Sequence, residues 1–91
     1  LHPGRTIVNT PGTPIPLSET SMSVVSVTGM AFDANTTDVS VGDKRVRARV
    51  GEANGLVLAA REGFTFHGVD LADVWIDAVT ALEGITWLAQ I

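Results

Sequence analysis

Residues 23–32 read SVVSVTGMAF, a run rich in β-branched side chains that is followed directly by Asp33-Ala34-Asn35. β-Branched residues are enriched in strands because they pack well on a pleated surface. Asp and Asn favour turns because their side chains hydrogen-bond to nearby backbone groups. We therefore expect residues 23–32 to form a core strand that ends in a turn.

The same pattern of short apolar run and turn continues to the C-terminus. Residues 45–50 (RVRARV) alternate strictly between charged and apolar side chains, which is typical of a strand with one wet and one dry face. Asn54-Gly55 is a strong turn dipeptide. Further short runs lie at residues 39–41, 56–58, 64–69, 74–76 and 85–88. Short strands at even spacing, separated by Gly, Asn and Asp turns, predict an all-β fold, a small β-sandwich or barrel.

A helix also fits residues 69–82. The apolar side chains that would share one helical face are Leu71, Val74, Trp75, Ala78 and Leu82. β-Branched and aromatic residues occupy the centre of this window, and turn residues lie close to both of its ends. These features favour a strand over a helix.

All four prolines lie in the first twenty residues, at Pro3, Pro11, Pro14 and Pro16. Proline fixes φ, lacks an N–H and pushes the preceding residue toward an extended conformation. The sequence therefore predicts an extended arm over residues 1–20 and a β-sandwich domain over residues 21–91. Residues 6–8 of the arm are able to pair as a short strand, and a frayed terminus is the alternative.

The composition restricts the class of protein. Ninety-one residues make one small domain, and 10 acidic against 6 basic residues give a net charge of −4. This sign disfavours nucleic acid as a partner. The absence of cysteine excludes disulfides and thiol chemistry. No run approaches the roughly 18 apolar residues of a membrane span, so no membrane partner is expected.

Few residues suggest chemistry. His67 and Asp70 lie three residues apart, a spacing that a general base and its orienting carboxylate can have. A surface histidine beside a turn is the favoured interpretation. The acidic clusters at residues 70–77 and 33–38 do not match a calcium loop. Neither a phosphate-binding loop nor a dinucleotide fingerprint is present. We therefore expect no enzyme, no catalytic residue, no cofactor and no metal.

The predicted contact residues fall into three groups. Arg45, Arg47 and Arg49 would share one strand face, and their planar forks suit carboxylates and phosphates. A solvated face, an acidic protein surface and nucleic acid are the three interpretations of that face. Trp75 and Trp87 are expected in the core, with one of them at a subunit contact as the alternative. The arm contributes Ile7, Val8, Ile15 and Leu17.

The order of several short motifs carries a resemblance. They are residues 12–17 (GTPIPL), 35–42 (NTTDVSVG), 54–58 (NGLVL), 62–63 (EG), 71–76 (LADVWI) and 84–88 (GITWL). From about residue 10 to residue 88, the chain resembles a loose group of small β-rich structural proteins of tailed-phage virions.

The resemblance implies a structural role without catalytic residues. It implies a capsid decoration (cement) protein that binds the major capsid protein on the outer surface of the virion. It also implies a homo-oligomer, with a trimer as the first expectation. A neck, tail or fibre protein is one alternative. A small carbohydrate-binding β-domain is another, and it requires an exposed aromatic platform for which Trp75 and Trp87 are the candidates.

Overall fold

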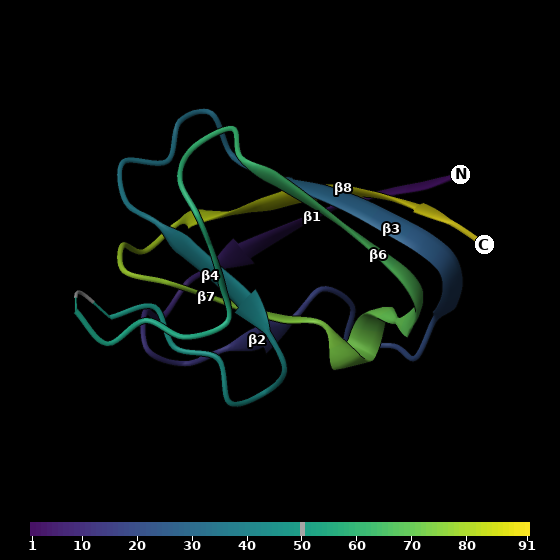
Figure 1. The fold of residues 1–91 in the computed structure, drawn as a ribbon, viewed down its shortest axis with the longest axis horizontal. Coiled ribbons are helices and arrows are strands. Elements are labelled where there is room, and N and C mark those ends of the chain that lie inside the picture. The colour runs from purple at the N-terminus through teal and green to yellow at the C-terminus, as the bar shows by residue number, and fades with distance from the viewer. Residues whose placement is uncertain (50) are drawn as a thin grey trace.

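Two antiparallel sheets face each other in the computed structural model, which describes residues 1–49 and 51–91 (Figure 1). The elements are β1 (His2–Val8), β2 (Ile15–Pro16), β3 (Ser23–Ala31), β4 (Val39–Gly42), β5 (Leu56–Leu58), β6 (Gly63–Asp70), the 3₁₀-helix η1 (Leu71–Asp73), β7 (Trp75–Ala78) and β8 (Glu83–Gln90). The predicted all-β fold is confirmed, and it is a small sandwich.

Each sheet has four strands. Sheet A has the order β1-β8-β3-β6, and sheet B has the order β2-β7-β4-β5. β3, the strand predicted from residues 23–32, lies inside sheet A between β8 and β6. β1 pairs with β8 from His2 opposite Ala89 to Val8 opposite Glu83, so the two chain termini lie at the same end of the sandwich (Figure 1).

The core lies between the sheets and follows the two-residue period of the strands. On β8, Ile85, Trp87 and Ala89 are buried, while Thr86 and Leu88 between them are exposed. Successive side chains of a strand point to opposite faces, so this alternation identifies the inner face of sheet A. The facing side chains of sheet B are Val39, Val41, Leu58, Ile76 and Ala78.

The expectation that the first twenty residues form an extended arm is wrong, because they belong to the sandwich. Residues 2–8 are a full edge strand of sheet A, and residues 15–16 pair with β7 at the edge of sheet B. The prolines permit this because an edge strand can turn a position that lacks an N–H away from the ladder. Val8 is completely buried and Leu17 is 5% exposed, so this segment supplies part of the core.

The alternating run RVRARV also differs from its prediction. Val46 and Ala48 are buried and Arg45 and Arg49 are exposed, so the inside–outside alternation is confirmed for residues 45–49. The backbone there is not paired in a ladder, however, and position 50 lies outside the described residues. Asn54 supplies a hydrogen bond that a neighbouring strand would otherwise make, because its backbone N–H donates to the carbonyl of Arg47 at 3.1 Å.

The strand prediction for the window 69–82 is confirmed by β7, and the helical alternative survives only as the single turn η1. Asp70 caps that turn, because its carboxylate accepts the backbone N–H of Ala72 at 2.9 Å. Among the described residues, no helix has the length and apolar character needed to cross a membrane.

A buried carboxylate fastens the loop between β3 and β4 to the start of β8. Glu83 accepts the backbone N–H of Thr37 at 3.1 Å and the hydroxyl of Thr36 at 3.0 Å, and it also accepts the Thr36 N–H and the Thr37 hydroxyl. Burial by itself would raise the pKa of Glu83. The hydrogen bonds to the ionised form outweigh burial and hold the pKa below its ordinary value.

This shift predicts a pH dependence of stability. The pKa of Glu83 is lower in the folded state, so its stabilising effect is complete above the ordinary value of 4.5 and is lost as the pH falls through the lowered folded pKa. Urea unfolding between about pH 7 and about pH 3 should show this loss. The Glu83→Gln variant should have a shallower pH dependence, and equal dependences in the two proteins would contradict the assignment.

Candidate functional site

A basic loop covers the outer face of sheet B. We call residues 43–49 the arginine loop; they follow β4 and lie above Asp77 of β7. Asp77 is 0% exposed and follows Ile76, whose side chain faces the core, so Asp77 points to the opposite face of the sheet. Its Oδ2 accepts the N–H of Ala48 at 2.9 Å, and its Oδ1 accepts the N–H of Gly12 at 2.9 Å. One buried carboxylate thus holds two loops against the sheet.

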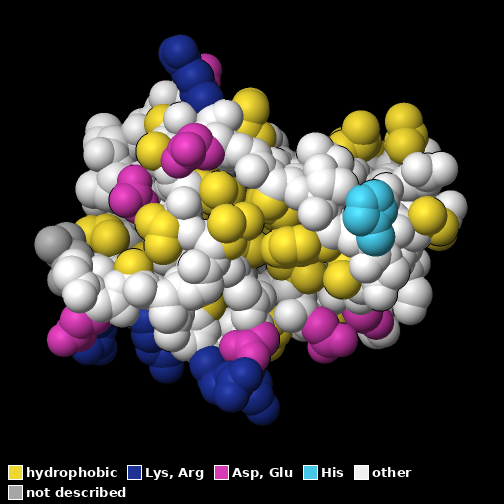
Figure 2. All heavy atoms as spheres, in the orientation of Figure 1, with side chains coloured by type: hydrophobic (Ala, Val, Ile, Leu, Met, Phe, Trp, Pro, Cys, Tyr) yellow, Lys and Arg dark blue, Asp and Glu magenta, His cyan; other side chains and the backbone are white. Residues whose placement is uncertain are grey.

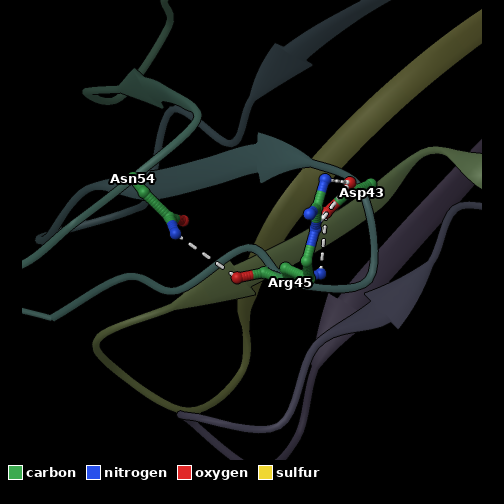
Figure 3. A network of polar contacts seen from close by, with 3 residues as sticks. All are labelled: Asp43, Arg45 and Asn54. Atoms are coloured by element: carbon green, nitrogen blue, oxygen red, sulfur yellow. Dashed lines mark hydrogen bonds and ion pairs between the residues drawn. The ribbon is translucent and has the colours of Figure 1, made fainter.

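Local contacts hold the shape of the arginine loop. The guanidinium of Arg45 turns back onto Asp43, with Nη2 at 2.7 Å from Oδ2 (Figure 3). Asn54 reaches the loop from its other end: its side-chain oxygen accepts the N–H of Arg47 at 2.8 Å, and its amide donates to the carbonyl of Arg45 at 3.4 Å. The hydrogen bond from Arg45 holds the pKa of Asp43 below its ordinary value.

The loop concentrates positive charge on an acidic protein. Four of the six basic residues lie at residues 44–49, although the net charge of the chain is −4. Figure 2 shows Lys and Arg side chains gathered along the lower border of the face in view. Arg49 is 65% exposed, and its nearest acidic partner, Glu52, stands 3.7 Å away. An exposed pair of this kind contributes little stability, so Arg49 is available to an external partner.

A hollow of about 400 Å³ adjoins the arginine loop. It is lined by Thr36, Thr37, Asp38, Ser40, Ala48, Arg49, Gly51, Ala53, Val57 and Val79. The Ser40 hydroxyl has no hydrogen-bond partner among the described residues, but Ser40 is 0% exposed. Most of the wall of the hollow is apolar, and the exposed residues Thr36, Asp38 and Arg49 bring polar groups to it.

The structure does not bring the other predicted contact residues to one surface. Val8, Leu17 and Trp87 lie in the core, and Ile7, Ile15 and Trp75 are half-buried. The expectation that the arm residues present a contact surface fails for Val8 and Leu17, because β1 and the segment after β2 close the sandwich. Arg45 and Arg49 are the exposed candidates. Arg47 is half-buried, and its guanidinium donates to the carbonyl of Val46 at 2.7 Å.

No hydrogen bond joins His67 to Asp70 in the part of the chain that the structure describes. His67 is exposed on β6, whereas the Asp70 carboxylate is occupied by the Ser21 hydroxyl and by the N–H groups of Met22 and Ala72. These hydrogen bonds, the one from Ser21 first, lower the pKa of Asp70. Within residues 1–49 and 51–91, no three His, Asp or Glu side chains are grouped so that they could hold a metal ion.

Sequence reasoning missed the role of Asp77. It grouped this residue with Asp70 and Asp73 as an acidic cluster, whereas Asp77 is the member of the three that holds Gly12 and Ala48 over sheet B. The feature of the sequence that could have identified Asp77 is that it is the single carboxylate among the apolar residues of the strand WIDA. A charge at such a position requires buried hydrogen-bond partners.

Comparison of the chain with models of protein families, with curated protein sequences and with solved structures finds no match.

Proposed function

We propose that this chain is a structural protein of a tailed-phage virion, and specifically a decoration protein that binds the major capsid protein on the outer surface of the capsid. The observation that carries the proposal is the arginine loop: Asp77 and Asn54 hold it against sheet B, and Arg49 is exposed on it. The order of the sequence motifs at residues 12–17, 35–42 and 84–88 supports the same assignment.

A held loop suits docking onto a protein surface. A loop that is ordered before binding loses little further conformational entropy on association. Arginine forks recognise carboxylates with defined geometry, and complementary charge speeds the encounter of two proteins. The complementary surface on the capsid would be acidic. The proposal assigns the chain a binding role and no catalytic step.

Binding to phage heads tests the proposal. Purified protein mixed with heads at moderate salt should co-sediment in a saturable manner, with a fixed number of copies for each capsid protein. Arg49→Glu should weaken binding by about tenfold, which corresponds to about 1.4 kcal/mol. The control is Arg5→Glu, which makes the same charge change at an exposed residue of β1 that stacks on Phe32. Binding that responds equally to both variants, or to neither, would contradict a role for the arginine loop.

The same assay distinguishes a decoration protein from a neck, tail or fibre protein. Heads that lack tails should bind the protein if it decorates the capsid. Binding that appears only with tailed particles would move the protein to the neck or tail. A carbohydrate-binding platform has less support, because Trp87 is 8% exposed and Trp75 is half-buried.

A further inference from the structure

The free edge of β6 is the least protected edge of the sandwich. Sheet edges are normally kept from pairing with other chains by shortness, prolines or charged side chains. β2 has two residues, β5 has three, and β1 carries Pro3 and Arg5. β6 has eight residues and contains no proline and no Lys, Arg, Asp or Glu before Asp70. Among the described residues, β3 is the one strand beside it in sheet A (Figure 1).

The hydrogen-bond pattern shows which β6 groups face this edge. Ala31 donates its N–H to Glu62 on the β6 side, whereas Phe32 donates its N–H to Gly84 on the β8 side. In an antiparallel ladder these directions alternate along the strand. Odd-numbered residues of β3 therefore bond toward β6. Their partners on β6 are the even-numbered residues, for example Phe64 opposite Gly29. The N–H and C=O groups of Gly63, Thr65 and His67 consequently point to the open edge.

The side chains along this edge would not prevent a second strand from pairing with it. Phe64 is buried, and Phe66 is half-buried against the core, with the two ring centroids 4.9 Å apart. Thr65 and His67 are exposed on the outer face of sheet A. A strand laid antiparallel to this edge would add its own contacts to Phe66 and meet no formal charge at pH 7 between Gly63 and Val69.

We propose that β6 pairs antiparallel with β6 of a second copy of this chain, about a two-fold axis at Thr65. Gly63 then lies opposite His67 of the second copy, and their outward N–H and C=O groups bond to each other. Phe64 lies opposite Phe66 of the second copy in this register. The buried Phe64 ring covers Gly29 of β3, so the half-buried Phe66 is the aromatic side chain that remains to contact the second copy. The two sheets A become one continuous sheet.

A second copy is the occupant that this edge fits. The pairing is isologous, so one sequence supplies both sides and the outward groups of Gly63, Thr65 and His67 are satisfied on both chains. A two-fold contact closes at two copies, whereas the sequence leads us to expect a trimer, so the number of chains in the oligomer distinguishes the two. It does not depend on the capsid proposal, because it concerns the isolated protein.

Sedimentation velocity across a range of concentrations, combined with residue-resolved amide exchange, tests the pairing. The mass should rise from one chain to two with concentration. Amides of Phe64 and Phe66 should be protected at every concentration, whereas those of Thr65 and His67 should become protected only in the dimer. A single chain at all concentrations up to about 1 mM would overturn the proposal. A mass of three chains, or a dimer with unprotected Thr65 and His67 amides, would also overturn it.

A matched pair of variants locates the contact. Thr65→Lys places two like charges opposite each other at the two-fold axis and should raise the dissociation constant at least about tenfold. Thr86→Lys introduces the same charge at an exposed threonine of the same sheet, on the inner strand β8, and should leave it unchanged. Circular dichroism should show both variants folded. Equal dimerisation of the two variants would place the contact elsewhere.

Discussion

Asp77→Ala is expected to lower the free energy of unfolding by about 4 kcal/mol and to release the arginine loop. The carboxylate is 0% exposed and accepts the N–H groups of Gly12 and Ala48. Without it, the buried N–H of Ala48 and the partly buried N–H of Gly12 lose their acceptor, and each loss costs about 1–3 kcal/mol. Such a loss is a large part of the stability of a small domain, which is typically about 5–15 kcal/mol.

Urea unfolding measures the stability change, and amide exchange at Gly12 and Ala48 measures the release of the two loops. Asp73→Ala is the matched control, because it removes an exposed carboxylate from η1 nearby and should change stability by less than about 0.5 kcal/mol. In the head-binding assay, Asp77→Ala should also weaken binding, since the loop would have to be ordered on association. Protection of the Ala48 amide that survives the substitution would refute the role assigned to Asp77.

Trp87→Ala is expected to destabilise the protein by about 3–5 kcal/mol, the usual range for removal of a buried tryptophan side chain. Trp87 lies in the core cluster on β8, and its indole N–H donates to the Thr6 hydroxyl at 3.1 Å. That hydroxyl in turn donates to the carbonyl of Leu17 at 3.0 Å. The chain of bonds connects β8, β1 and the segment after β2, so the substitution weakens both the core and the attachment of the N-terminal residues.

The space for this ring is made by Gly4 on the neighbouring strand. A Cβ at Gly4 would lie 2.1 Å from the indole ring, so the residue opposite Trp87 must be glycine. Trp87→Phe separates the two contributions: it keeps an aromatic ring and loses the N–H donor, and it should cost less than Trp87→Ala. Equilibrium unfolding followed by circular dichroism gives both values. If Trp87→Ala lowered the free energy of unfolding by less than about 1 kcal/mol, the indole would not stabilise the core as described.

Local patterns predicted the strands well where the decisive property was local. The β-branched run at residues 23–32 is β3, and the alternation of residues 45–49 reports which side chains are buried. The same alternation gave a wrong structure for that segment. Alternation indicates only that one side of a segment is covered and the other is exposed. A loop that lies against the outer face of a sheet meets this condition as well as a strand does.

The candidate site was predicted only in part. The arginines could be identified because a concentration of one charge is visible in composition alone. The residue that supports the arginine loop could not be identified in this way, because Asp77 lies 29 residues from Ala48 and 65 residues from Gly12 in the sequence. The proline-rich start was misjudged for a related reason: proline excludes a central strand, but only the complete sheet shows which strands lie at an edge.

Local sequence patterns are sufficient to predict an all-β protein of short strands with a basic segment, because strand propensity, turn chemistry and charge act between close neighbours. The tertiary structure alone decided that residues 2–8 close sheet A against residues 83–89, that Asp77 holds two distant loops, and that β6 is left with an open edge. These outcomes depend on pairing between residues far apart in the chain. Such pairing is set by how all the strands together bury their apolar faces and satisfy their backbone hydrogen bonds.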